Sequence, residues 1–164
     1  MRDLLAALLA VALLIVAASL ATTLQQYRRR RQRARDSERA LGRAIIAEIP
    51  SEADLALFSE DDKRFYYGEQ RIDKDLVTAV SVLINGAPIA GYVSKRAGPR
   101  AAVSSASIED RPEGIARDRW DVTIETITAT TLVPCGAIRE RVSQELARAV
   151  FEAVKRSLEA ADTR

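Results

Sequence analysis

The feature that most constrains this chain is an uncharged run near its start. Residues Leu4 to Leu24 read LLAALLAVALLIVAASLATTL, and these 21 positions hold no charged residue, proline or glycine. As a helix the run would be about 31 Å long at ~1.5 Å per residue, which matches the ~30 Å hydrocarbon core of a bilayer. The sequence therefore predicts a transmembrane anchor over residues 1–24.

A basic segment follows the run directly. Its arginines, called here the arginine block, are Arg28, Arg29, Arg30, Arg31, Arg33 and Arg35. Residues 25–49 are predicted to continue as a helix, a basic juxtamembrane neck with a short apolar stripe of Leu41, Ile45 and Ile49. Because the side richer in Lys and Arg stays in the cytoplasm, we expect the N-terminus outside and the C-terminal domain cytoplasmic, at a bacterial-type inner membrane. The block is expected to contact anionic lipid headgroups.

A second interpretation of the opening run is a cleaved secretory signal. Ser19-Leu20-Ala21 satisfies the small-x-small rule for cleavage, although the run exceeds the ~7–15 apolar residues usual for a signal. Cleavage would leave a periplasmic or secreted binding domain. If the anchor is retained, its alanines at four-residue spacing allow close helix packing and hence oligomers: Ala6/Ala10 and Ala17/Ala21.

The charge is unevenly distributed, and this limits the partners. The whole chain has a net charge of +2, while residues 25–48 hold eight arginines against three acids and residues 1–24 are neutral. The remainder is therefore mildly acidic, at −3, so we expect no nucleic-acid partner. The chain has no histidine and one cysteine, Cys135, and it lacks zinc and phosphate-loop patterns. Neither a metal nor a cofactor is expected.

Residues 50–164 read as one small α+β domain. We expect a short helix over 51–58, and a further helical turn from Ser59 to Tyr66. Asn85-Gly86 lies between apolar runs at 76–84 and 89–93, which favours a β-hairpin. A helix over 75–84 ending at Gly86 stays open as an alternative, since Leu76, Val80 and Leu83 also fit a 3.6-residue period.

The second half of the domain has a strand and a helix that stand out. A third strand over 101–108, an exposed loop over 109–119 and a strand over 120–133 ended by Pro134 are predicted. Residues 136–161 are predicted to form an amphipathic helix that covers a small, mainly antiparallel sheet. Its expected apolar stripe is Ile138, Val142, Leu146, Ala149, Val150, Val154 and Leu158.

One pair of residues has the spacing of a catalytic motif. Cys135 precedes the predicted helix and Arg141 follows six residues later, a C-x5-R spacing that resembles the cysteine phosphatases. The resemblance covers seven residues and implies a phosphate cradled between a low-pKa thiolate and an arginine at a helix start. Pro134 stands where that family usually has histidine.

The remaining signals favour a protein without enzymatic activity. We expect a single-pass, membrane-anchored accessory or assembly subunit that presents a small interaction domain to a membrane-protein complex. Loop 95–119 is the predicted partner-binding segment, and its basic members are Lys95, Arg96, Arg100, Arg117 and Arg119. The acids Asp61, Asp62, Asp73 and Asp75 are interpreted as helix caps and turn residues.

Overall fold

The computed structural model describes residues 2–50, 55–97 and 118–163, and the side chains of these ranges from residue 13 onward. The chain divides into two compact units, residues 1–41 and residues 42–164. Each unit is described by itself.

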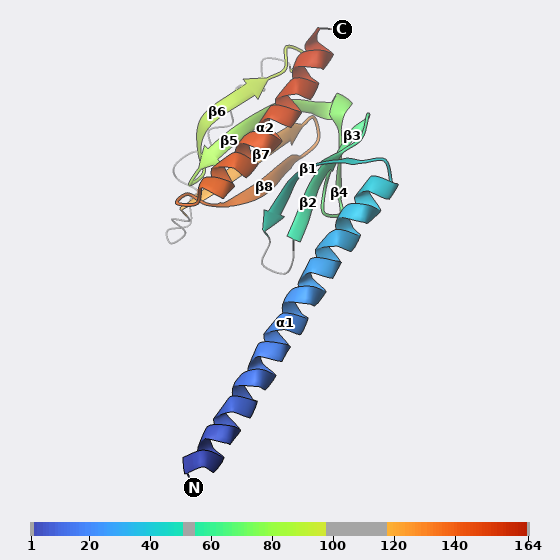
Figure 1. Cartoon of the computed structure of the whole chain (residues 1–164). Coiled ribbons are helices and arrows are strands. Elements are labelled where there is room, and N and C mark those ends of the chain that lie inside the picture. Colours follow the sequence, from blue (N-terminus) through green and yellow to red (C-terminus); the bar gives the residue numbers. More distant parts are fainter. Residues whose placement is uncertain (1, 51–54, 98–117, 164) are drawn as a thin grey trace. The chain divides into compact units, whose positions relative to one another are not determined.

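The first unit is a single long helix, α1 (Arg2–Ala40), drawn in blue in Figure 1. It contains the predicted anchor run and the arginine block on one continuous helix. Where side chains are described, no helix combines the length and the apolar character needed to cross a membrane. The side chains of residues 4–12, the first part of the predicted anchor, lie outside the described residues.

The predicted helical neck over residues 25–49 is wrong beyond Ala40. Gly42 has a φ of +73°, a left-handed conformation that commonly ends a helix, and β1 (Ala44–Pro50) begins two residues later. Ala47 and Ile49 are buried in β1. The apolar residues of this segment thus follow the two-residue period of a strand, although Leu41, Ile45 and Ile49 also fit a helical stripe.

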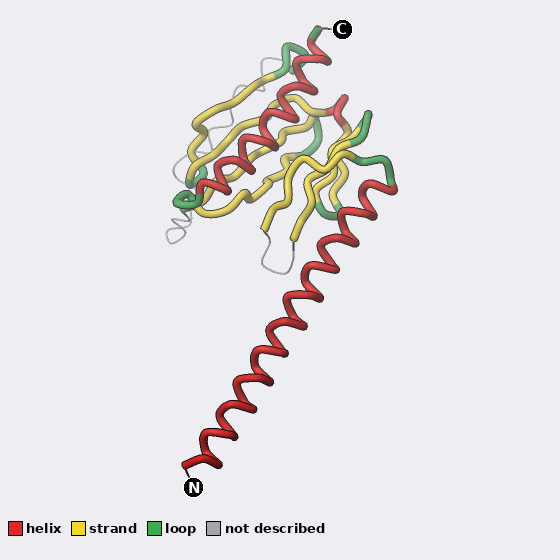
Figure 2. The backbone as a smooth tube through the Cα atoms, in the orientation of Figure 1, coloured by secondary structure: helices red, strands yellow, loops and turns green. Residues whose placement is uncertain are grey.

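The second unit contains two four-stranded antiparallel sheets and a C-terminal helix, as Figure 2 shows in yellow and red. The α+β fold class is thereby confirmed, with two small sheets where one was expected. The first sheet has the order β1-β2-β3-β4, with β2 (Leu55–Glu60), β3 (Arg64–Tyr67) and β4 (Gln70–Asp73). The second sheet has the order β6-β5-β7-β8, with β5 (Val77–Ile84), β6 (Ala87–Val93), β7 (Arg119–Thr126) and β8 (Thr130–Ala137).

Two helices predicted in the first sheet are wrong. Leu55 to Phe58 belongs to β2, while residues 51–54 lie outside the described residues. The expected helical turn from Ser59 to Tyr66 is instead a hairpin turn, because the Asp61 carboxylate accepts the N–H groups of Lys63 and Arg64 at 2.8 and 2.7 Å. This side-chain contact competes with helix formation and leads the chain directly into β3.

The second sheet confirms the hairpin at Asn85-Gly86. Both residues have positive φ, as a two-residue hairpin turn requires, and β5 pairs with β6 on either side of them. Residues 77–84 are therefore strand, and the helical alternative is wrong. The chain enters β5 from a single 3-10 turn, η1 (Lys74–Leu76).

The single strand predicted over residues 120–133 is two strands. A turn at residues 127–129 separates β7 from β8, and it closes where Thr126 N and Oγ1 both donate to the Ala129 carbonyl at 2.8 Å. Pro134 lies inside β8 and does not end it. This strand is at the end of its sheet, where the missing N–H of proline is tolerated. The strand predicted over 101–108 and most of the loop predicted over 109–119 lie outside the described residues.

The C-terminal helix, α2 (Arg141–Asp162), begins five residues later than predicted. The helix begins later because β8 continues to Ala137, with Gly136 at a φ of +115°. Val142 is 62% exposed, so its predicted place in the buried stripe is wrong. The residues of α2 that are buried are Ser143, Ala147, Val150, Ala153, Val154 and Leu158.

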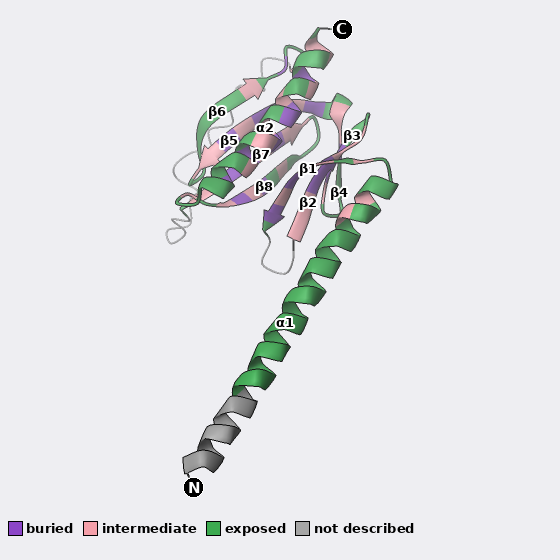
Figure 3. Cartoon of the chain, in the orientation of Figure 1, coloured by how far each residue is buried: buried purple, intermediate pink, exposed green. Residues whose placement is uncertain are grey.

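One apolar core joins the two sheets beneath α2, and the buried positions appear in purple in Figure 3. The helix contacts β5, β7 and β8 of the second sheet and β1 of the first. The edge strands β1 and β8 also contact one another. At the centre of the first sheet, Phe58 and Phe65 stack with ring centroids 5.7 Å apart, and both are fully buried.

The stacked pair generates a stability prediction. Phe58→Ala removes a fully buried ring, and we expect the free energy of unfolding to fall by about 3–5 kcal/mol. Leu132→Ala is the control, because Leu132 is 46% exposed and its truncation should cost far less. Urea denaturation of the full chain in detergent checks both values. Equal losses in the two variants would contradict the placement of Phe58 in the core.

Candidate functional site

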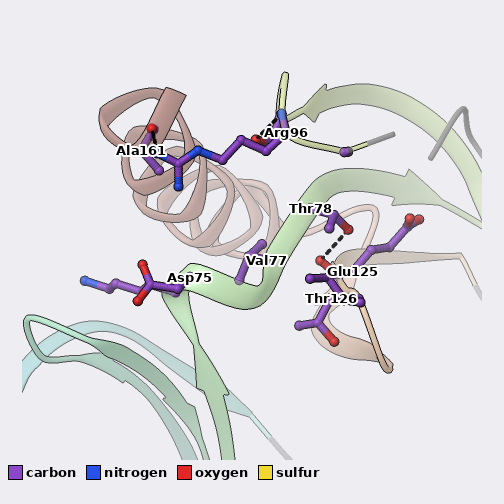
Figure 4. A pocket seen from close by; sticks show the side chains of 11 residues that line it. Asp75, Val77, Thr78, Arg96, Glu125, Thr126 and Ala161 are labelled. Atoms are coloured by element: carbon purple, nitrogen blue, oxygen red, sulfur yellow. Dashed lines mark hydrogen bonds between the residues drawn. The ribbon is translucent and has the colours of Figure 1, made fainter. Parts of the chain in front are cut away.

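A groove lies beside the C-terminal end of α2. Its first part, shown in Figure 4, has a volume of about 360 Å³ and lies between η1, the end of β7 and the last turn of α2. Val77, Ala97 and Ala161 form apolar walls, and Ile127 of the β7–β8 turn stands at the rim. Figure 4 shows Arg96 reaching across to Ala161, with Asp75 and Val77 on the opposite side.

A second hollow of about 290 Å³ continues the groove along η1 and α2. The two hollows share Lys74, Asp75 and Ala161 in their linings. The second one is more polar, and its other lining residues are Glu60, Asp62, Ala153, Arg156, Ser157 and Ala160. Together they form one open groove with charged residues along its length, less polar at the first hollow and more polar at the second.

One carboxylate holds a wall of this groove in place. Asp162, the last residue of α2, accepts hydrogen bonds from Ser94 Oγ at 2.5 Å, Tyr92 OH at 3.0 Å and Lys95 N at 3.1 Å. Arg96 adds a bond from its guanidinium to the Ala161 carbonyl. The end of β6 is therefore tied to the end of α2, and the hydrogen bonds offset the unfavourable position of an acid at a helix C-terminus.

Two carboxyl groups beside the groove, those of Asp162 and Asp61, have lowered pKa values. The hydrogen bond from Ser94, followed by those from Lys95 and Tyr92, holds the pKa of the Asp162 carboxyl below its usual value. On the second hollow's side, a hydrogen bond from Tyr66 and N–H donors from the turn lower the pKa of Asp61. Lys74 Nζ lies 2.8 Å from Glu60 Oε2 and 2.7 Å from the Asp61 carbonyl oxygen, so its charge is already matched.

The predicted catalytic pair is not arranged as a phosphate cradle. Cys135 lies within β8, is fully buried and donates a weak hydrogen bond to the Val133 carbonyl at 3.5 Å. Burial raises the pKa of its thiol to about 12, the opposite of what a nucleophile needs. The Arg141 side chain is 89% exposed and forms an ion pair with Glu145 at 3.2 Å. The thiol faces the core while the guanidinium faces solvent.

A buried ion pair adjoins the cysteine, and sequence analysis missed it. Arg119 Nε lies 2.6 Å from Asp121 Oδ1, and the Asp121 side chain is only 8% exposed. Arg119 was predicted as a loop residue for partner binding, but it begins β7 and contacts Asp121 of its own strand. The charges of this pair act electrostatically on the Cys135 thiol and on the Tyr67 phenol. Burial raises the pKa of that phenol. The arrangement is a structural charge pair within the fold.

The other predicted site residues fall in different parts of the molecule. Arg96 lines the groove, and the main-chain N–H of its neighbour Lys95 donates to Asp162, whereas Arg100 and Arg117 lie outside the described residues. The arginine block lies on α1, where its side chains are exposed apart from the half-buried Arg35. In the described ranges, no cluster of three or more His, Cys, Asp or Glu residues is placed to hold a metal ion.

Sequence reasoning missed the groove itself. Asp75 was interpreted as a turn residue, Ile127 as part of one long strand, and Asp162 lay beyond the predicted helix. One signal in the sequence could have indicated this surface. Ile127 is a large aliphatic residue flanked by Thr126 and Thr128, with Thr130 close by, and in the structure it is exposed in a turn. No family model, curated protein or solved structure matches this chain.

The buried thiol generates a reactivity prediction. Because a pKa near 12 instead of 9 lowers the thiolate fraction at pH 8 about 1,000-fold, Cys135 should react with a maleimide at least that much more slowly than free cysteine. Mass spectrometry of the native protein over time measures the rate. Addition of urea should restore fast labelling, and rapid labelling without urea would show that the thiol is accessible.

The Asp162 contacts generate a pH prediction. A carboxyl whose pKa is lowered on folding stabilises the protein above its unfolded value near 3.8, and this contribution is lost as pH falls through the folded value. Asp162→Asn should therefore lower the free energy of unfolding at pH 7, and its difference from wild type should shrink below pH 4. Chemical denaturation at several pH values provides the measurement.

The matched control for that series is Glu145→Gln, which removes a carboxylate from the exposed N-terminal part of the same helix. The free energy of unfolding of this variant should fall by only a few tenths of a kcal/mol at pH 7, as is usual when an exposed i,i+4 ion pair is removed. An Asp162→Asn variant as stable as Glu145→Gln at pH 7 would show that the three hydrogen bonds to Asp162 contribute little.

Proposed function

We propose that this protein is a single-pass membrane-anchored, non-enzymatic accessory or assembly subunit that presents its folded unit at the cytoplasmic face of a membrane. The observation that carries the proposal is the uncharged run Leu4–Leu24 followed directly by the arginine block. Both lie on one helix of 39 residues, so no break separates the apolar part from the basic part. An arginine block in this position favours retention on the cytoplasmic side.

The folded unit supports a role in binding. Its groove has a less polar and a more polar end, and the large aliphatic residue Ile127 is 71% exposed at the rim of the less polar one. Exposed aliphatic residues next to a hollow are typical of surfaces that contact other proteins. A membrane anchor would raise the effective concentration of such a surface for partners in the same membrane.

The placement of Cys135 weighs against the alternative of a cysteine-dependent enzyme. A phosphatase nucleophile needs a thiolate that is exposed to substrate, whereas this thiol is buried with a raised pKa. Arg141 is directed to solvent and paired with Glu145, so it is not positioned to share a phosphate with Cys135. A binding role accounts for the exposed groove without requiring either residue.

Reporter fusions test the anchor and its orientation. One reporter active only in the cytoplasm and one active only outside it are joined to Arg164, and an antibody blot gives the product size. We expect a full-length product with only the cytoplasmic reporter active. A shortened product with the external reporter active would show that the run is a cleaved signal and that the domain is periplasmic or secreted.

A matched pair of variants tests the cause of the orientation. Replacing Arg28–Arg31 with glutamine should move a large share of the chains to the opposite orientation, because four of the block's charges are lost. The control replaces four arginines of the folded unit, Arg139, Arg141, Arg148 and Arg156, with the same loss of charge. Unchanged orientation in the first variant would contradict the role given to the block.

A further inference from the structure

We propose that the groove binds an extended peptide segment with an aliphatic residue at one position and a lysine or arginine two positions further on. This inference rests on the proposed function, because it names the chemistry of the partner that an interaction domain would recruit. In an extended chain, residues two apart point to the same side, so both side chains of such a segment can enter the groove together.

The first hollow suits the aliphatic side chain. It is the less polar of the two hollows, because Val77, Ala97, Ile127 and Ala161 line it. Its charged lining residues balance one another, with Asp75 and Glu125 against Lys74 and Arg96. Ile127 stands at the rim with 71% of its surface exposed, and its N–H donates to the Leu76 carbonyl at 3.1 Å. This bond ties the β7–β8 turn to η1 at this end of the groove, and an aliphatic side chain from a partner would remove apolar surface of Ile127 and Val77 from water.

The second hollow suits the cation. Asp75 lines both hollows, and neither Asp75 nor Asp62 has an ion pair in the part of the chain that the structure describes. Lys74 does not compensate them, because its ammonium group is already matched by Glu60. Asp75 shares both linings with Ala161, which lies in the last turn of α2, where the helix carries its negative partial charge.

The remaining basic residues of the groove are held by main-chain groups. Arg96 donates to the Ala161 carbonyl, and Arg156 Nε donates to the Glu152 carbonyl at 3.3 Å. The groove lining contains four acids, Glu60, Asp62, Asp75 and Glu125, against Lys74, Arg96 and Arg156. The folded unit as a whole is also acidic, with a net charge of −3. Charge complementarity therefore favours a basic segment over an acidic one.

A peptide titration followed by NMR tests the inference. The full chain is prepared in detergent micelles with labelled isoleucine methyl groups, and three capped pentapeptides are added in turn. Their centres are Leu-Ser-Lys, Leu-Ser-Gln and Leu-Ser-Glu, so only the charge at the third position changes. We expect the lysine peptide to shift the Ile127 methyl signal most strongly. The methyl of Ile89, exposed on β6 at the other end of the sheet, is the internal control.

Two variants establish whether the charge acts through the groove. Asp75→Asn should weaken binding of the lysine peptide about threefold, the effect of losing one exposed ion pair, and should leave the glutamine peptide unaffected. Glu145→Gln, which removes an acid far from the groove along α2, should change neither. Equal or stronger binding of the glutamate peptide, or no shift of Ile127 with about 5 mM of any peptide, would overturn the inference.

This outcome is separable from that of the proposed function. The reporter fusions measure where the domain lies, while the titration measures what the groove binds. An external reporter signal together with specific lysine-peptide binding would overturn the orientation and leave the groove assignment standing. A cytoplasmic reporter signal together with no specific binding of the lysine peptide would overturn the groove assignment alone.

Discussion

The burial of one face of α2 is the interaction on which the rest of the folded unit depends. Val150, Val154 and Leu158 are almost fully buried, and they share one core with Ile49, Phe58 and Phe65 of the first sheet and Val80, Ile124 and Val133 of the second. A four-stranded sheet of this size has too little apolar surface on one face to be stable by itself. Packing both sheets against the same helix joins two marginal elements into one core.

The groove is a consequence of the same packing. Asp162 ties the last turn of α2 to Ser94, Tyr92 and Lys95 at the end of β6. η1 lies opposite because the chain must pass from β4 of the first sheet to β5 of the second. The hollow between these elements therefore lies where the chain crosses from one sheet to the other, and its walls come from both.

Local signals in the sequence were sufficient for some elements. Asn85-Gly86 predicted the hairpin, because few residues other than glycine and asparagine adopt two successive positive φ values. The 3.6-residue repeat of apolar residues predicted most of α2. Residues 44–60 were misinterpreted because Ile45, Ile49 and Leu55 fit both a helical and a strand period, and only pairing between β1 and β2 decides between them.

The candidate site was hardly predictable either, because local sequence patterns do not show which distant residues come together. Asp75, Arg96, Ile127 and Ala161 are far apart in the sequence, and only the tertiary fold brings them together. The lone cysteine drew attention because it lies near a helix start, but β8 continues past it and directs the thiol into the core. A short catalytic spacing carries little information until the strand and helix boundaries around it are known.

The central claim is that α2 makes the two sheets one cooperative unit. Hydrogen exchange of the full chain in detergent, compared between wild type and Val154→Ala, tests it most directly, since Val154 is fully buried in the shared core. The account predicts that amide protection falls by the same free energy in β2 and β3 of the first sheet and in β5 and β7 of the second. Loss of protection in only one sheet would show that the sheets are stabilised independently and would contradict the claim.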